Sequence, residues 1–140
     1  MAAFSAMCVS VLRRGRHSVS RLVVHLVFVT RYRKKILEAR HLSTMEATCL
    51  RVAEKMGFQI LEFNGETDHV HLLIEYPPAL SASNLVNQLK GVSSRILRKD
   101  FNLRIQGEHL WSASYFASSA GGATIETLRQ YIKEQDHPKE

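Results

Sequence analysis

Cysteine is scarce in this chain. Of its 140 residues only Cys8 and Cys49 are cysteines, and they lie far apart in no C-x-x-C motif. The sequence therefore predicts neither a disulfide framework nor a cysteine zinc site. Two isolated thiols are typical of a reducing compartment, so we expect a cytoplasmic protein.

Long hydrophobic runs are also missing. The longest one, Leu22 to Val29, is interrupted by His25 and is far too short to span a bilayer. Nothing in the chain resembles a G-x-x-x-x-G-K-[ST] loop, which argues against nucleotide hydrolysis. Internal repeats and low-complexity segments are absent as well.

Acidic residues are absent from the first 37 positions, since the first one is Glu38. The basic residues before it are Arg13, Arg14, Arg16, Arg21, Arg31, Arg33, Lys34 and Lys35. This segment carries +8, so the remainder of a chain with net charge +6 carries −2 (6 − 8). Such a block favours polyanions, most simply nucleic acid. For Arg13 to Arg16 a solvated, solubilising tail is the open alternative.

Apolar periodicity and turn signals divide the chain into alternating elements. The predicted elements are a strand at 21–30, a helix that ends at Gly57, strands at 58–63 and 69–76, a helix at 83–99, a short strand at 114–118 and a helix that ends near Gln135. This order predicts an α+β fold, a ferredoxin/RRM-like antiparallel sheet with helices on one face plus a C-terminal helix. At this length we expect one domain at 21–140, preceded by a flexible basic arm at 1–20.

Several boundaries follow from local signals. Ser43 and Glu46 have the spacing of a capping box and predict the start of the first helix. Asn64-Gly65 predicts the turn of a hairpin between the second and third strands. Gly121-Gly122 and a capping Thr124 open the last helix.

His69-Val70-His71 is the most informative motif. In a strand, His69 and His71 project from the same side while Val70 points into the core. In the last helix, Tyr131 and Gln135 are four residues apart and share a face. Two imidazoles and one amide oxygen are suitable ligands for a divalent cation, with a tyrosine hydroxyl beside them. Such a set is suited to attack on a phosphodiester.

Each half of this constellation also has an ordinary interpretation. An H-x-H in a strand is often a pair of surface or hydrogen-bonded histidines. A tyrosine near the end of an amphipathic helix is usually an aromatic at the edge of the core, with its hydroxyl in water.

Six segments together resemble a known family. They are RLVVHLVFVTRYRKKIL (21–37), DHVHLLI (68–74), LKGVSSR (89–95), LWSASYF (110–116), Gly121-Gly122 and Tyr131-Ile-x-x-Gln135. In order and spacing they resemble the HUH single-tyrosine transposases of the smallest bacterial insertion sequences, the insertion-sequence 200/605 family. The resemblance covers about residues 17 to 137. Ala113 stands where the family usually has a proline.

The resemblance implies a mechanism for a bacterial or archaeal enzyme. Tyr131 would attack a DNA phosphate, become joined to the 5′ phosphate and release a 3′-OH. Mg²⁺ or Mn²⁺ would be held by His69, His71 and the Gln135 amide. The family also implies a homodimer in which Tyr131 of one protomer works with the histidines of the other. Gly121-Gly122 would then be a hinge for the helix that carries Tyr131. An ordinary turn at these two glycines is the alternative interpretation.

The resemblance further implies that the substrate is single-stranded DNA with hairpins at the element ends. The candidate DNA-binding residues are His25, Arg31, Tyr32, Arg33, Lys34, Lys90, Ser94 and Arg95. Tyr32 among cations is suited to stacking on a base. The alternative interpretation of Lys90 and Arg95 is that they lie on a solvated helix face. The alternative for His25 is a buried strand histidine that is hydrogen-bonded to the backbone.

Two other functions stay open. A non-catalytic RRM-like nucleic-acid-binding module shares the element order, but its strands carry aromatics where this chain has histidines and aliphatics. A repeat-hairpin-associated tyrosine nuclease that is not mobile would carry the same chemical groups.

Overall fold

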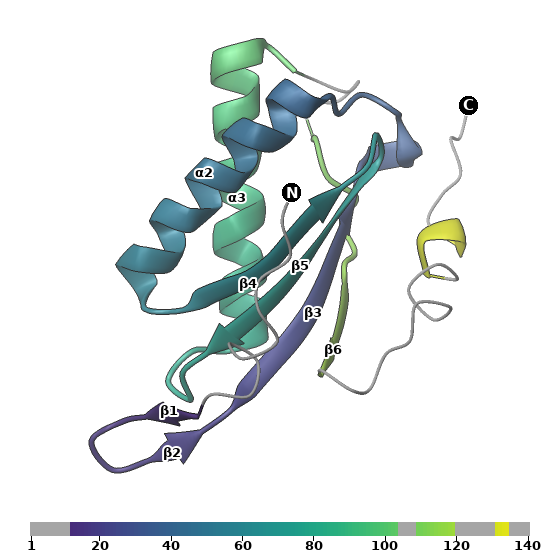
Figure 1. Ribbon diagram of the computed structural model, residues 1–140. Coiled ribbons are helices and arrows are strands. Elements are labelled where there is room, and N and C mark those ends of the chain that lie inside the picture. Colours follow the sequence, from purple (N-terminus) through teal and green to yellow (C-terminus); the bar gives the residue numbers. More distant parts are fainter. Residues whose placement is uncertain (1–11, 104–108, 120–130, 135–140) are drawn as a thin grey trace.

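The computed structural model describes residues 12–103, 109–119 and 131–134 (Figure 1). Its elements are β1 (Arg13–Arg14), β2 (Val19–Ser20), β3 (Leu22–Val29), the 3₁₀ helix η1 (Arg31–Arg33), α2 (Ala39–Met56), β4 (Gln59–Gly65), β5 (His69–Tyr76), α3 (Ala82–Phe101) and β6 (Phe116–Ser119). Residues 131–134 are helical. The predicted start of the last helix at 121–124 and its end near Gln135 lie outside the described residues.

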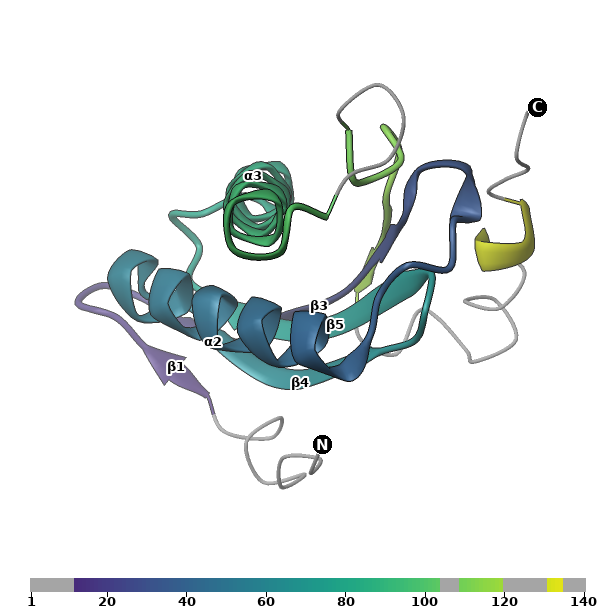
Figure 2. The same ribbon diagram turned by 90° about the horizontal axis from the view of Figure 1, so that it is seen from above.

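Four strands form one antiparallel sheet in the order β4-β5-β3-β6. The long helices α2 and α3 both cover the same face of this sheet (Figure 2). This arrangement is the predicted ferredoxin-like fold. Within the described residues no helix is both long and apolar enough to cross a membrane.

The core lies between the sheet and the two helices. Leu26 and Phe28 of β3 and Leu72 of β5 are fully buried there, together with Met45 of α2 and Leu89 of α3. Alternate residues of β3 and β5 therefore face the helices, as the two-residue period of a strand requires. The opposite face carries His25, His69 and His71, and we call it the histidine face.

The predicted start of the first helix is wrong. Helix α2 begins at Ala39, and the backbone N–H of its N-cap Glu38 donates to His41 Nδ1 at 2.9 Å. Ser43 and Glu46 lie inside the helix, where residues three apart are also neighbours on one face. The same spacing therefore occurs within a helix as well as at its start. Its end is as predicted, since Gly57 has the left-handed φ of 85°.

The predicted hairpin between the second and third strands is confirmed by the antiparallel pairing of β4 with β5, but its turn is not at Asn64-Gly65. Both residues belong to β4, where Asn64 pairs with His71 and Gly65 with Val70. A Cβ at Gly65 would lie 2.6 Å from Leu42 Cδ2, so the glycine allows close approach of α2 rather than a turn. The chain reverses one step later, where the Glu66 N–H donates to the His69 carbonyl at 2.9 Å.

Part of the predicted N-terminal arm forms regular structure. Strands β1 and β2 pair as a two-stranded ribbon, with Arg13 opposite Ser20 and Arg14 opposite Val19. The ribbon leads directly into β3 (Figure 1). Arginine-rich composition suggested solvation, but an ion pair to a distant strand holds the ribbon to the sheet.

The segment before β6 is clamped between β3 and α3. The Ser112 N–H donates to the Val29 carbonyl at 2.7 Å. On the helix side, the Trp111 indole N–H donates to Ser93 Oγ at 3.0 Å, and this buried hydroxyl donates to the Leu89 carbonyl at 2.6 Å. A buried serine thus satisfies the polar atom of the chain's single tryptophan.

Ser93→Ala is expected to lower the free energy of unfolding by about 1–3 kcal/mol, because the indole N–H of Trp111 would stay buried without an acceptor. Urea unfolding followed by tryptophan fluorescence measures the change. The control is Ser94→Ala at the half-buried neighbouring position, which we expect to change stability by less than about 0.5 kcal/mol. Equal effects of the two substitutions would show that the Trp111–Ser93 bond contributes nothing.

Candidate functional site

The two histidines of the H-x-H motif project from the same face of β5, as predicted. His69 pairs with Val29 and His71 with Val27 of β3, while Val70 and Leu72 between and beyond them are buried against the helices. A two-residue period and one apolar core are enough to produce this arrangement. Both imidazoles therefore belong to the histidine face.

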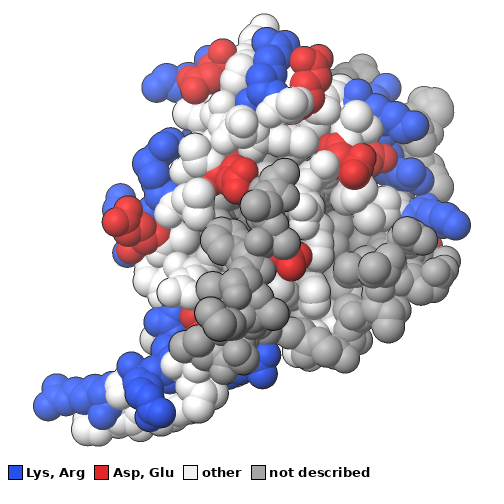
Figure 3. All heavy atoms as spheres, viewed as in Figure 1, with Lys and Arg blue, Asp and Glu red and all other residues white. Residues whose placement is uncertain are grey.

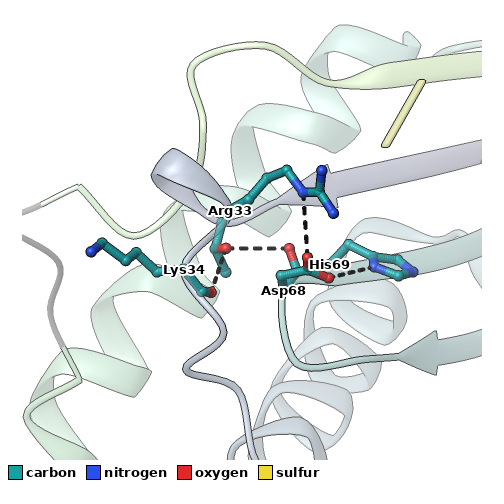
Figure 4. Close-up of polar contacts among 5 residues, drawn as sticks. Arg33, Lys34, Asp68 and His69 are labelled. Carbon is teal, nitrogen blue, oxygen red and sulfur yellow. Dashed lines mark hydrogen bonds and ion pairs between the residues drawn. The ribbon is translucent and has the colours of Figure 1, made fainter. Parts of the chain in front are cut away.

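His69 is held by its neighbour Asp68. The Nδ1 atom of His69 lies 2.9 Å from Asp68 Oδ1, and Asp68 Oδ2 lies 3.5 Å from Nε of Arg33. Figure 4 shows Arg33 and His69 both joined to Asp68 and Lys34 pointing away from it. A carboxylate accepts the Nδ1–H and so leaves the Nε2 lone pair of His69 available to a ligand.

The His71 side chain contacts a histidine side chain of the neighbouring strand. Its Nε2 lies 2.9 Å from Nδ1 of His25, and the two rings stack with centroids 5.1 Å apart. Burial, followed by the charges of His25 and His69, lowers the pKa of His71 to about 4. At neutral pH this imidazole is therefore uncharged, which is the state that binds metal ions.

His25 itself is half-buried. Its partner is the His71 side chain rather than the backbone group that we considered for it. Burial lowers the pKa of His25, and the nearby Glu62 carboxylate partly opposes this shift. The contact with His71 was not predicted, because it depends on the register of β3 against β5.

The histidine pair fits a divalent cation as two of its ligands. His69 has its outer ring nitrogen available, and His71 is neutral. The described residues contain no group of three or more histidines, cysteines and carboxylates able to hold a metal ion. A further ligand is therefore required, and the predicted one, Gln135, lies outside the described residues.

Tyr131 lies against the β6 segment. Its hydroxyl is 3.2 Å from Ser114 Oγ, and its ring centroid is 5.2 Å from that of Phe116. Burial raises the pKa of Tyr131, and the Ser114 hydrogen bond partly opposes this shift. The phenol is therefore protonated at neutral pH.

Tyr131 is thus placed beside β6. Phe116, which it contacts, pairs with Val27, and Val27 pairs with His71 on its other side. Two strand spacings put Phe116 about 10 Å from His71 along the sheet. Sequence reasoning missed Ser114 and Phe116 as partners of Tyr131, although both lie in the Trp-Ser-Ala-Ser-Tyr-Phe motif.

Lys90, a predicted DNA contact, is directed towards the backbone of residues 112–114. Its ammonium donates to the Ser112 carbonyl at 2.7 Å and lies 3.5 Å from the carbonyls of Ala113 and Ser114. Burial lowers the pKa of Lys90. The lysine therefore holds the backbone that carries Ser114, and DNA binding by Lys90 stays a prediction.

The other predicted DNA contacts fall in two places. Arg31, Tyr32, Arg33 and Lys34 form a tight basic loop next to Asp68, in which the Arg31 guanidinium stacks over the Tyr32 ring. Ser94 shares with Lys90 a surface hollow of about 380 Å³ that Trp111 also lines. Arg95 is exposed on α3. The structure thus brings the basic loop next to His69 and leaves the α3 residues apart from it.

The chain is similar in sequence to transposases. The family description "Transposase IS200 like" matches residues 18–135. The transposase of insertion sequence IS200 from Salmonella typhimurium is 29% identical over 114 residues, 79% of this chain and 74% of that protein. The ISDra2 transposase TnpA of Deinococcus radiodurans is 27% identical over 132 residues, 92% of this chain and 94% of that protein.

Solved structures agree with this result. A crystal structure assigned to a transposase of Deinococcus radiodurans R1 superposes with a TM-score of 0.79 at 27% identity, covering 89% of this chain and 98% of the other. A REP-associated tyrosine transposase bound to a REP hairpin shares the fold, with a TM-score of 0.57 at 12% identity over 86% of this chain and 67% of the other. The family match covers most of the chain and all the motifs quoted above, and the chain therefore belongs to the IS200-like transposases of the insertion-sequence 200/605 family.

Proposed function

We propose that this transposase nicks and rejoins single-stranded DNA at the ends of its element through a covalent link to Tyr131. The observation that carries the proposal is the paired projection of His69 and His71 from one face of β5, with His69 held by Asp68. An H-x-H pair oriented in this way in a transposase supports phosphodiester chemistry more than a surface role.

The tyrosine supplies the nucleophile. Its phenolic oxygen forms a bond to the phosphorus as the bond from phosphorus to O3′ breaks, so the 5′ side becomes a phosphotyrosine and O3′ leaves as a hydroxyl after taking a proton. Because the pKa of Tyr131 is raised, the phenol must give up its proton as it attacks. Attack by a 3′-OH on the phosphotyrosine reverses the step and conserves the phosphodiester, so rejoining needs no nucleotide.

The histidines supply the metal ligands. His69, His71 and Gln135 would hold Mg²⁺ or Mn²⁺, which when bound withdraws charge from a phosphate oxygen. Asp68 orients His69 for this task. The lowered pKa of His71 keeps its imidazole neutral at neutral pH, and because its Nε2 already contacts His25, an ion would bind through Nδ1 or in place of that contact.

The position of Tyr131 supports a shared site in a homodimer. Within one chain Tyr131 packs on Ser114 and Phe116, and Phe116 itself is about two strand spacings from His71. In the dimer, the helix that carries Tyr131 would serve the histidine pair of the partner.

The DNA partner we propose is a hairpin at each element end. A hairpin is bound to the REP-associated tyrosine transposase that shares this fold. The basic loop 31–34 lies beside His69 through the Arg33–Asp68 ion pair, where it is suited to hold a phosphate backbone.

Tyr131→Phe is expected to abolish the covalent adduct, a loss of at least ~10³-fold, because phenylalanine has no nucleophilic oxygen. Purified protein is mixed, in the presence of Mn²⁺, with single-stranded oligonucleotides from the DNA that flanks its gene. Adducts that survive SDS are then quantified on denaturing gels. EDTA added to the reaction should prevent the adduct from forming, because it removes the divalent ion.

The matched control is Tyr115→Phe, an exposed tyrosine next to β6, which should form adduct at the wild-type level. Tight hairpin binding by the wild type without adduct in either metal would overturn the enzymatic proposal and favour a binding module.

Asp68→Asn is expected to weaken Mn²⁺ binding about 10- to 100-fold, because the amide loses the charge that fixes the Nδ1–H of His69. Titration of free Mn²⁺ by electron paramagnetic resonance measures this without any activity assay. Asp100→Asn, at an exposed position on α3, is the control. If His69→Ala abolishes Mn²⁺ binding and Asp68→Asn leaves it unchanged, Asp68 has no role in orienting the ligand.

A further inference from the structure

The basic ribbon 13–20 is an ordered projection. Its two strands pair in register, and its turn is closed by a hydrogen bond from the Gly15 N–H to the Ser18 carbonyl at 2.7 Å. Figure 3 shows the blue arginine side chains gathered on this projection. Such a ribbon presents its side chains in a defined geometry, unlike a disordered tail.

A half-buried ion pair anchors the ribbon to the sheet. The Arg13 guanidinium donates from Nε to Glu75 Oε2 at 2.7 Å and from Nη2 to Oε1 at 2.6 Å. Glu75 is only 5% exposed and pairs with Val23, which forms a small buried apolar cluster with Leu61 and Leu73. A bidentate pair to a buried carboxylate fixes the geometry of the guanidinium. The ribbon therefore keeps a fixed direction relative to β5.

The remaining arginines of the ribbon face solvent. Arg13 and Arg14 are adjacent in a strand and so point to opposite sides, and Arg14 is exposed. Arg16 is exposed in the turn. Neither has a salt-bridge partner among the residues that the structure describes, and no acidic residue precedes Glu38 in the chain. Their charge is available to an outside anion.

We propose that this ribbon docks on the duplex stem of a DNA hairpin, with Arg14 and Arg16 on the phosphates. A two-stranded β-ribbon fits the major groove of B-form DNA, whereas single strands offer it no groove. Guanidinium groups bind phosphate oxygens in the bidentate geometry that Arg13 uses with Glu75. The exposed Val19, opposite Arg14, adds an aliphatic contact suited to a thymine methyl group.

The ribbon lies far from the histidine pair. His69 pairs with Val29 at one end of β3, and the ribbon joins β3 at Leu22. Seven residue steps separate these positions by about 23 Å. The inference rests on the proposed function for its substrate, but stem binding and strand cleavage are separable at this distance.

The test compares the wild-type chain with the double variant Arg14→Gln/Arg16→Gln. Binding is measured by fluorescence anisotropy for a hairpin from the DNA flanking the gene and for an unstructured oligonucleotide of equal length, over a range of salt concentrations. We expect hairpin affinity to fall about 10- to 100-fold and the slope of log K against log salt to shrink by about 0.9 for each lost phosphate contact. Affinity for the unstructured strand should change less than about threefold.

The matched control is Arg51→Gln/Lys55→Gln, which removes the same charge from exposed positions on α2 and should leave hairpin affinity unchanged. Wild-type hairpin affinity and salt slope in the ribbon variant would overturn the proposal. Equal losses for hairpin and unstructured DNA would overturn the assignment to duplex. Unchanged hairpin binding with a loss of binding to phosphatidylserine vesicles would assign the ribbon to membranes instead.

The experiments distinguish failure of the ribbon proposal from failure of the proposed function. If the wild type forms no adduct but the ribbon variant still loses hairpin affinity selectively, stem docking holds and the nicking chemistry is wrong. If the ribbon variant cleaves a short single-stranded substrate at the wild-type level and binds hairpins normally, the chemistry holds and stem docking is wrong.

Discussion

The pairing of β3 with β5 is the constraint on which the rest of the structure depends. In this register Leu26 and Leu72 face the helices together, and Val27 lies opposite His71 on the other face. A slip of one residue would exchange the faces of a strand, burying imidazoles and exposing aliphatic side chains. The free energy of burying the apolar side chains therefore also holds the histidines on one surface.

Asp68 connects three parts of the molecule at the entrance to β5. Its carboxylate contacts His69 and Arg33, and its backbone carbonyl accepts the Thr30 N–H at 2.9 Å. Asp68, which is only 6% exposed, thus connects the end of strand β3, the basic loop and the histidine pair. At the other end of the sheet the Arg13–Glu75 pair has the same effect on the ribbon. A buried carboxylate paired with an arginine thus anchors a basic segment at each end of the sheet.

Much of the fold and half of the candidate site could be predicted, because those features depend on local periodicity. The common face of His69 and His71, the end of α2 at Gly57 and the element order follow from two- and 3.6-residue repeats and one left-handed glycine. The errors arose where a local signal has two meanings. Gly65 suggested a turn, but it allows close approach of α2 to β4.

The sequence by itself determined the fold class, the family, and the face from which the two histidines project, since each depends on pattern along the chain. Only the tertiary structure decided that His25 contacts His71, that Tyr131 packs against β6, and that Glu75 captures the ribbon through Arg13. Arg13 and Glu75 are 62 residues apart. Strand register and burial bring such groups together, and neither the register nor the partner of a buried charge is encoded in its neighbours along the chain.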